Sequence, residues 1–249
     1  ATIFSQGMAG LCSLIYIIKK YDILCPHPGE WKIRTPYIRN IIRMSMPMGL
    51  QYSITAIGAI ILQYSVNTLG STAIAGFSAG SKIKSFFVCP LNSLGTALSS
   101  FAGQNFGARK MDRIRKGVRS TLAMGIVYSL VVIVIIFFAG DFIAGLFVDS
   151  GESPLVIQYG SQFARYISVF HLELAVLFTF RYAVQGMGYG QYSIYSGLAE
   201  MLGRSVVALL LVPMYGFTAV CWNEGITFIA GIAVIVPIYF VLMHRQETI

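Results

Sequence analysis

The feature that most limits the possible folds is the length of the uncharged stretches. Residues 44–81 contain no Asp, Glu, Lys or Arg over thirty-eight positions, and residues 120–140 contain none over twenty-one. A helix that crosses a bilayer needs about 20 mostly apolar residues, so 120–140 fits one crossing and 44–81 is too long for one. The Gly70-Ser71-Thr72 sequence is typical of a tight turn and predicts where the longer stretch divides.

Composition supports the same interpretation. Hydrophobic residues make up 56% of the 249 residues and charged residues only 11%, whereas a soluble domain carries about 25% charged residues. A soluble globular protein is therefore excluded, and so is a disordered one, which needs low hydrophobicity and high charge. We predict an all-α polytopic membrane protein whose six transmembrane helices form a bundle over residues 44–69, 73–102, 120–140, 155–185, 192–213 and 217–243.

The basic residues predict the orientation of this bundle. Thirteen of the eighteen Lys and Arg lie outside the predicted spans, six of them within 19–43, six in the loop 103–119, and the last at Arg245. The connections on the other side carry none, namely the turns near Gly70 and Gly216 and the loop 141–154. Because cations mark cytoplasmic loops, we expect a multi-pass cell-membrane protein with both ends of the bundle in the cytoplasm. The net charge of +8 comes largely from these loops, so a nucleic-acid partner is not expected.

The N-terminal residues predict a division of the chain. The sequence begins with Ala1, and residues 1–18 are apolar until Lys19 and Lys20. A signal peptide would place its positive charge first, so we expect the tail of a preceding transmembrane helix instead. Residues 19–43 are then a cytoplasmic connector and residues 44–249 a six-helix lobe. On this interpretation an upstream part of the protein is missing from the sequence.

Eight charged residues fall inside the predicted spans, and their cost requires an explanation. They are Lys82, Lys84, Arg165, Glu173, Arg181, Glu200, Arg204 and Glu224. Each charge near the bilayer centre costs about 2.5–3.5 kcal/mol, so eight unpaired charges would cost above roughly 20 kcal/mol. Arg181 lies near the expected cytoplasmic end of its helix and can extend to the interface. The others should be paired or face a wet cavity, which indicates transport or chemistry within the membrane.

Glu200 and Arg204 are the most informative of these residues. They lie four positions apart, which places them on one helix face with the acid on the N-terminal side. One interpretation is an ion pair that fixes helix packing. In the other, Glu200 exchanges its partner for a proton or a cationic substrate. Glu173 is likewise a candidate ligand for a proton or cation, or else a partner of Arg165 or Arg181.

Three further polar residues complete the candidate substrate and ion pathway. Glu224 is expected to contact a lysine of another helix. Gln51 and Asn67 belong to a set of amides in the first two spans, for which hydrogen bonding between helices is the simpler role. We expect neither cofactor nor enzymatic activity, because the sequence has no Walker A or HExxH motif. Its four cysteines form no CxxC pair, and no metal ligand is assigned.

Several motifs resemble the multidrug and toxic compound extrusion (MATE) family. The loop Gly103-Gln104-Asn105-Phe106-Gly107-Ala108 is similar to the family's G-Q-N-x-G-A segment after the second helix of a six-helix lobe. Further matches follow the family's order: Pro47, Gly49, Leu50 and Gln51, then Gln63, Asn67 and Gly70, then Glu200 and Arg204, then Tyr215 and Gly216. The resemblance covers nearly the whole chain, as helices seven to twelve of the family.

The resemblance implies one lobe of a twelve-helix antiporter that expels small cationic drugs or dyes. Exchange for H⁺ or Na⁺ would drive export, and the partner of this lobe would be the missing N-terminal lobe. One branch of the family has an acid about two turns after the helix-seven proline, where this sequence has Thr55. This departure suggests the branch whose main Asp lies in the absent half.

Two alternatives remain open. A lipid-linked oligosaccharide flippase of the same wider superfamily would need a larger cationic cavity. An intramembrane enzyme would need a nucleophile or metal constellation, and the sequence has neither. For the antiporter we expect deprotonated Glu200 or Glu173 to hold a cation, and protonation to weaken that hold.

Overall fold

The computed structural model describes residues 2–21, 25, 35–148 and 153–247. The chain divides into two compact units, residues 1–42 and residues 43–249. Unit 1 contains α1 (Thr2–Lys20) and the first turns of α2 (Thr35–Asn67). Lys19 and Lys20 occupy the last turn of α1, where cations interact favourably with the helix dipole. Most of the predicted connector 19–43 lies outside the described residues, and the division at residue 18 stays a prediction.

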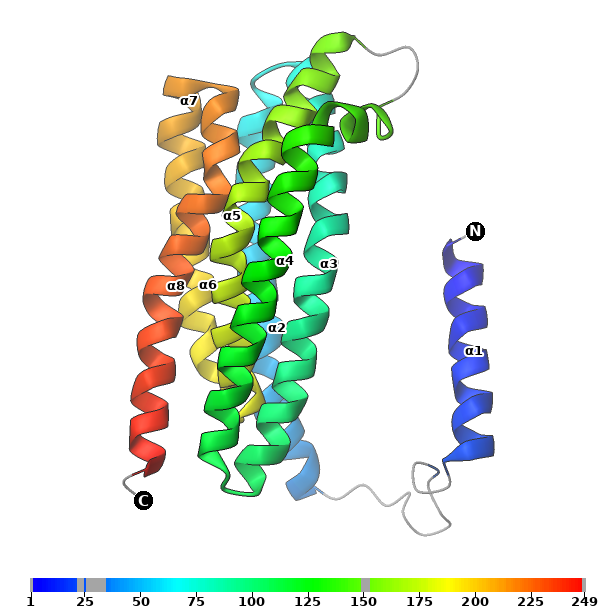
Figure 1. The fold of residues 1–249 in the computed structure, drawn as a ribbon, viewed down its shortest axis with the longest axis vertical. Coiled ribbons are helices and arrows are strands. Elements are labelled where there is room, and N and C mark those ends of the chain that lie inside the picture. Colours follow the sequence, from blue (N-terminus) through cyan, green and yellow to red (C-terminus); the bar gives the residue numbers. More distant parts are fainter. Residues whose placement is uncertain (1, 22–24, 26–34, 149–152, 248–249) are drawn as a thin grey trace. The chain divides into compact units, whose positions relative to one another are not determined.

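Unit 2 is built from long helices that run alongside one another (Figure 1). After α2 come α3 (Ser71–Gly107), α4 (Met111–Gly145), α5 (Pro154–Gly186), the short 3₁₀ helix η2 (Gly190–Tyr192), α6 (Ser193–Val206), the π-helical turn η3 (Val207–Leu211), α7 (Val212–Tyr215) and α8 (Phe217–Glu247). Every regular element in the described ranges is helical. The run from η2 to α7 forms one crossing, so the prediction of an all-α six-helix bundle is confirmed.

Five of these segments are long and apolar enough to cross a membrane by length and composition, namely α2, α4, α5, Gly190–Tyr215 and α8. The remaining predicted span, residues 73–102, lies in α3, which has 37 residues. Serines, glycines, Lys82 and Lys84 interrupt the apolar residues of α3, so it is not a uniformly apolar helix. A polar helix in a membrane bundle needs protein or water around it.

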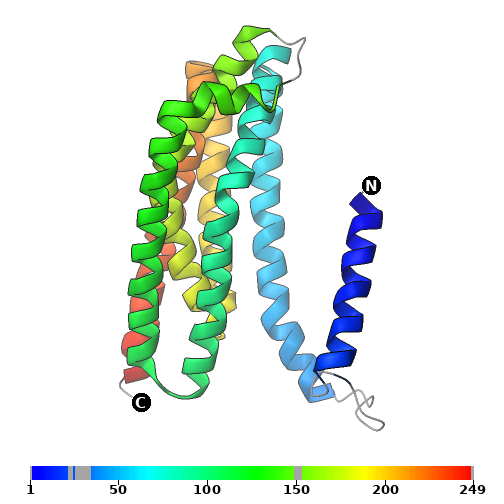
Figure 2. The same ribbon diagram turned by 45° about the vertical axis from the view of Figure 1, so that its right-hand side comes forward.

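The helices around the α3–α4 turn are longer than the sequence predicts. We expected a loop over residues 103–119, but α3 continues to Gly107 and α4 begins at Met111, and only Ala108–Lys110 connect them. Figure 2 shows the resulting antiparallel hairpin. The physical reason is that arginine and lysine oppose burial in lipid but are good helix formers. The helices can therefore extend beyond the apolar layer.

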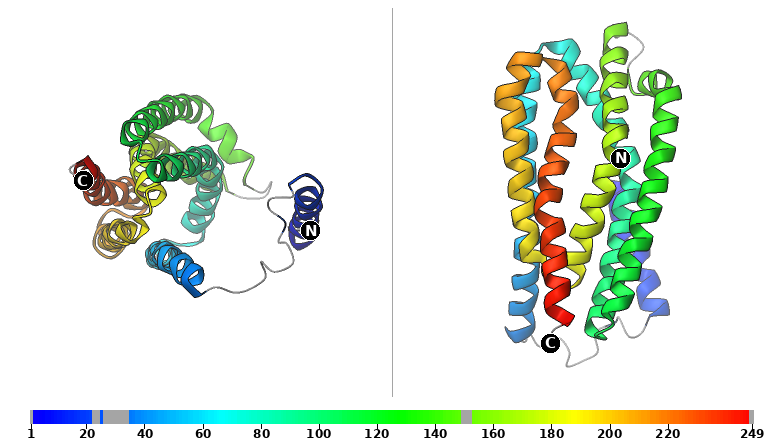
Figure 3. Two further views of the ribbon diagram at one scale, coloured as in Figure 1. Left: turned by 90° about the horizontal axis from the view of Figure 1, so that it is seen from below. Right: turned by 60° about the vertical axis from the view of Figure 1, so that its left-hand side comes forward.

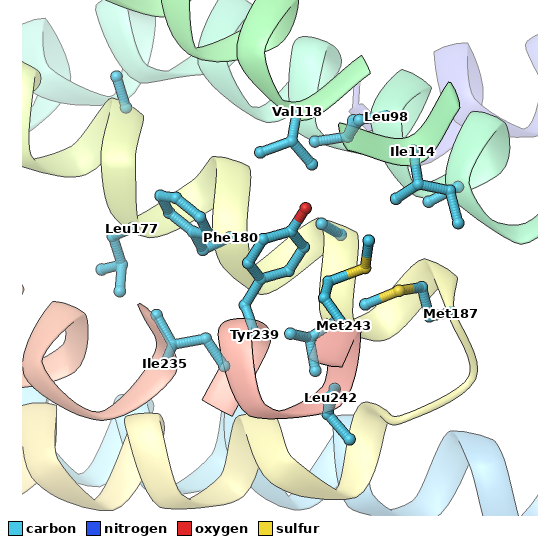
Figure 4. Packing of buried hydrophobic residues seen from close by; sticks show 14 of the residues in the cluster. Leu98, Ile114, Val118, Leu177, Phe180, Met187, Ile235, Tyr239, Leu242 and Met243 are labelled. Atoms are coloured by element: carbon cyan, nitrogen blue, oxygen red, sulfur yellow. The ribbon is translucent and has the colours of Figure 1, made fainter. Parts of the chain in front are cut away.

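Helix α5 occupies the centre of unit 2 and packs against α3, α4 and α8 (Figure 3). Close approach at its C-terminal end depends on Gly186, where a Cβ would lie 2.3 Å from the carbonyl oxygen of Ser99 on α3. Small residues let helix backbones approach in a membrane. The largest apolar cluster lies around the C-terminal half of α5 and includes Leu177, Phe180, Tyr239 and Met243 (Figure 4).

The turns at one end of the bundle use backbone conformations that favour glycine. Gly70 between α2 and α3 has φ 94°, and Gly216 between α7 and α8 has φ 57°. Both turns were predicted from the sequence, and both are present. The α3–α4 turn and the end of α8 lie together at the opposite end (Figure 1). We call this the basic end, because Arg109, Lys110, Arg113, Arg115, Lys116, Arg119 and Arg245 lie there.

Candidate functional site

The candidate site is a set of charged side chains buried between the helices of unit 2. It consists of Lys84 on α3, Arg181 on α5, Glu200 and Arg204 on α6, and Glu224 on α8, which we call the buried charge cluster. All but Lys84 are buried. Each helix carries only one or two of these charges, so the cluster forms only when the helices pack together.

Glu224 links three helices through its carboxylate. Its Oε1 atom lies 2.7 Å from Nζ of Lys84, and its Oε2 atom lies 3.7 Å from Nη2 of Arg204. The first contact is a charge-assisted hydrogen bond, whereas the second is an ion pair too long for one. Nη1 of Arg204 also donates to the carbonyl oxygen of Thr55 on α2 at 3.3 Å. The predicted contact of Glu224 with a lysine of another helix is confirmed.

Glu200 has a different partner from the one that its spacing suggests. Its carboxylate binds the guanidinium of Arg181 on α5, and Arg181 also donates to Oγ of Ser196 at 3.0 Å. The hydroxyl of Ser196 lies 3.2 Å from Oε1 of Glu200 and 3.3 Å from the carbonyl oxygen of Gly231 on α8. The pair is therefore enclosed by three helices.

The structure contradicts one of the two interpretations of Glu200 and Arg204, and it contradicts the expected position of Arg181. Glu200 and Arg204 share a face of α6, but they do not pair with each other, since each binds a residue of another helix. Arg181 does not extend to the interface, because it is 7% exposed and holds Glu200. The physical reason is the same in both cases. A buried charge gains most from a partner that also fills the space between helices, and spacing along one helix does not reveal such a partner.

Glu173 remains the acid without a cationic partner among the described residues. Neither Arg165 nor Arg181 pairs with it, since Arg165 lies 2.7 Å from Asp141 and Arg181 holds Glu200. Its Oε2 atom is buried and has no hydrogen-bond partner in the described part of the chain. A buried carboxylate oxygen without a partner is costly, so it is a natural position for a bound proton or cation. Nearby His171 contacts the carbonyl of Ile167 through Nδ1 at 2.8 Å and is not part of this position.

The two candidate amides lie in different surroundings. Gln51 on α2 is buried, and its Oε1 atom accepts a hydrogen bond of 3.1 Å from Nε2 of Gln185 on α5. Asn67 is exposed near the other end of α2, and its Oδ1 atom accepts a 2.9 Å hydrogen bond from Gln63 on the same helix. Gln51 therefore lies among the buried polar groups between α2 and α5, whereas Asn67 stays apart from them.

The sequence identified part of the cluster and missed the rest. Lys84, Arg181 and Gln185 were not selected as site residues, although the first two are charges inside apolar spans. The presence of a charge inside an apolar span could have identified Lys84 and Arg181, because each buried acid needs a cationic partner. Within the described ranges no group of three or more His, Cys, Asp or Glu side chains is placed to hold a metal ion. The chemistry that the cluster offers is the making and breaking of ion pairs between helices.

Comparison with known proteins relates this chain to transporters. Residues 47–210 match the MatE family model. The probable multidrug resistance protein YpnP of Bacillus subtilis is 29% identical over 190 residues, which cover 76% of this chain and 41% of that protein. A FAD transporter of Shewanella oneidensis is 20% identical over 243 residues, or 98% of this chain and 51% of that protein. The chain thus spans about half the length of these relatives.

A solved structure has the same fold. The outward-facing conformation of a multidrug resistance MATE family transporter of the MOP superfamily superposes on this chain with a TM-score of 0.88. The two sequences are 18% identical, and the superposition covers 100% of this chain and 56% of the other. At this identity the likeness shows the shared fold alone.

Proposed function

Because this chain belongs to the MatE family, we propose that it forms one lobe of a secondary active exporter of small cationic amphiphilic drugs or dyes. Inward flow of H⁺ or Na⁺ would drive the export. The second lobe would complete a twelve-helix transporter, in which alternating access comes from the movement of one lobe against the other. The observation that carries the proposal is the buried charge cluster, because its acids can exchange partners.

The ion pairs give the lobe a plausible switch. Glu224 joins α8 to α3 and α6, with 2.7 Å between its Oε1 atom and Nζ of Lys84. A proton on Glu224 would remove the charge that holds these helices together, and Lys84 would then favour a wetter position. Charges within membrane helices commonly mark such relays. In this proposal the cluster changes helix packing, while the ion that drives transport binds elsewhere.

Glu173 is the group that we propose for the binding of that ion or the cationic substrate in this lobe. It differs from Glu200 and Glu224 in having no cation beside it among the described residues. Its Oε2 atom is buried and, like Oε2 of Glu224, accepts no hydrogen bond there. A carboxylate in this state can hold a cation and releases it when a proton binds. Of the two acids expected to act in this way, Glu200 is less suited, because Arg181 already neutralises it.

The orientation follows from the positions of the cations. We propose that the basic end faces the cytoplasm of the cell, because cytoplasmic ends of membrane bundles collect Lys and Arg. Both the N-terminal end of α2 and the C-terminal end of α8 would then be cytoplasmic.

The substrate class has two alternatives. The flippase interpretation would need an open cationic cavity at the buried charge cluster, where the cations are instead paired with Glu200 and Glu224. The relative that is a FAD transporter makes an anionic nucleotide the other substrate to test. The paired state of the cations favours the cationic drug over both.

The test is efflux of a cationic dye from cells that express the full protein as its gene encodes it. Cells of a strain without its own exporters are loaded with ethidium, energised, and followed with and without a protonophore or external Na⁺. We expect efflux that stops with the protonophore or on removal of Na⁺. Glu173→Gln should abolish this efflux, whereas the matched variant Asp141→Asn, an exposed acid of the same lobe, should retain it. No dye efflux despite membrane expression, or efflux of flavin nucleotide instead, would contradict the proposal.

A further inference from the structure

A cavity of about 610 Å³ lies between α4 and α8 at the basic end, away from the buried charge cluster. One face of α4 forms the first wall, with Arg115, Val118, Arg119 and Leu122 at helical spacing. A face of α8 forms the second wall, with Tyr239, Phe240, Met243 and His244. Figure 4 shows the inner part of this region, where Tyr239 extends from α8 toward Val118 on α4. The cavity thus follows the two helices from their ends into the apolar part of the bundle.

The floor of the cavity is aromatic. Phe180 on α5 lines it, and the ring of Phe180 packs edge-on against Tyr239 with 5.1 Å between ring centroids. Helix α5 packs closely against both α4 and α8, whereas α4 and α8 make few contacts with each other. The walls and floor are apolar over most of their length.

The charged residues that line the cavity are Arg115 and Arg119, and they lie at its outer end together with the imidazole of His244. Arg115 and Arg119 lie in the second and third turns of α4, and His244 lies in the last turn of α8. Leu122, about 10 Å beyond Arg115 and about 4.5 Å beyond Arg119 along α4, already belongs to the apolar part, given a rise of 1.5 Å per residue. The neighbouring cavity between α3 and α4, about 510 Å³, has one cation, Lys116. The two arginines therefore distinguish the first cavity.

Arg115 has enough donors to bind an added anion beside the partners that it already has. It lies 3.7 Å from the carboxylate of Asp112, whose side chain is 90% exposed. An ion pair this exposed contributes little, and a guanidinium has five N–H donors. Asp112 does not line the cavity. A ligand phosphate between Arg115 and Arg119 would therefore find guanidinium donors on both sides.

We propose that this cavity binds an anionic phospholipid of the membrane leaflet at the basic end. The headgroup phosphate would lie between Arg115 and Arg119, and an acyl chain would extend along Phe180 and Phe240. Basic pockets between transmembrane helices are suited to anionic headgroups, and this one adds an apolar wall that a free phosphate would not use. A cationic drug is excluded here, because it would face like charges. The proposal does not depend on transport activity.

The test is lipid binding by the detergent-purified full protein, measured by native mass spectrometry. Phosphatidylglycerol and phosphatidylcholine with identical chains are titrated in parallel, and glycerol phosphate and inorganic phosphate serve as competitors. We expect preferential retention of phosphatidylglycerol. The double variant R115Q/R119Q should bind it more weakly, by roughly fivefold for each arginine and about 25-fold for the pair. The control R109Q/K110Q removes the same charge from the α3–α4 turn, outside the cavity, and should bind as before.

A second variant tests the apolar wall without a change in charge. Leu122→Trp fills the cavity and should also weaken phosphatidylglycerol binding, so the proposal can be tested even if the arginine variant does not fold. Equal retention of the two lipids would overturn the proposal, and so would an equal loss in R109Q/K110Q, which would indicate general attraction to the basic end. Displacement of the lipid by millimolar inorganic phosphate would also overturn it, because the site would then be one for a free anion.

Discussion

Replacement of Glu224 by Gln tests whether the buried charge cluster stabilises the lobe. The carboxylate is 5% exposed and faces Lys84 at 2.7 Å and Arg204 at 3.7 Å. Loss of one partner from a buried ion pair costs about 3–5 kcal/mol, because a charge is left without compensation. The Lys84 side chain is 27% exposed, and Arg204 retains the carbonyl of Thr55. We therefore expect the lower end of that range, about 3 kcal/mol.

The assay is thermal unfolding of the detergent-solubilised protein. At about 2–4 °C per kcal/mol for a chain of this size, E224Q should lower Tm by roughly 6–12 °C. The matched control D141N removes the acid of an exposed pair, in which Asp141 and Arg165 are 65% and 43% exposed, and should cost at most about 1 kcal/mol. The double variant K84M/E224Q should recover part of the loss, since the uncompensated ammonium is gone. Equal losses in E224Q and D141N, or no recovery in the double variant, would refute the reasoning.

Three further predictions address packing, hydrogen bonding and orientation. Gly186→Ala places a Cβ 2.3 Å from the Ser99 carbonyl oxygen and should lower the free energy of unfolding by about 1–3 kcal/mol. The control Gly49→Ala places its Cβ where no atom lies within 4 Å and should leave the free energy of unfolding unchanged. Equal thermal shifts in the two variants would contradict the packing of Gly186 against Ser99. Gln51→Leu leaves the buried Gln185 amide without its 3.1 Å partner and should cost about 1–3 kcal/mol, while Q51L/Q185L should cost less in the same melt. In a cysteine-free background, an impermeant maleimide applied to intact cells should label a cysteine at Ser71 but not one at Arg113; the reverse pattern would show that the basic end faces outward.

The number and order of the helices were predictable because a segment that crosses lipid must be long, uncharged and helical. The uncharged stretches 44–81 and 120–140 required helices, and Gly70 and Gly216 marked turns that the structure confirms with positive φ angles. The uncharged stretches did not predict where the helices of the basic end begin and stop. Charge shows where a helix leaves the apolar layer, and α4 begins nine residues before the predicted span, at Met111 rather than at residue 120.

The sequence predicted most of the charged residues of the candidate site, but it did not predict which residues pair with one another. The energetic cost of charges in the membrane identified Glu200, Arg204, Glu224 and Glu173, and it correctly gave Glu224 a lysine partner. It could not show that α5 brings Arg181 to Glu200, because helix packing decides which faces meet. The i,i+4 spacing of Glu200 and Arg204 was misleading, since two charges on one face can bind different neighbours. Only the packed bundle distinguishes the compensated acids from Glu173.

The most direct test of the central proposal is transport by the purified full protein in liposomes with an imposed ion gradient. Dye-loaded proteoliposomes receive a pH gradient or a Na⁺ gradient, each without the other, in wild type and in Glu173→Gln. We predict that one gradient drives dye movement against its own concentration difference, and that the variant loses this coupling. Dye movement that ignores both gradients, or an unchanged response in Glu173→Gln, would contradict coupled exchange through this lobe.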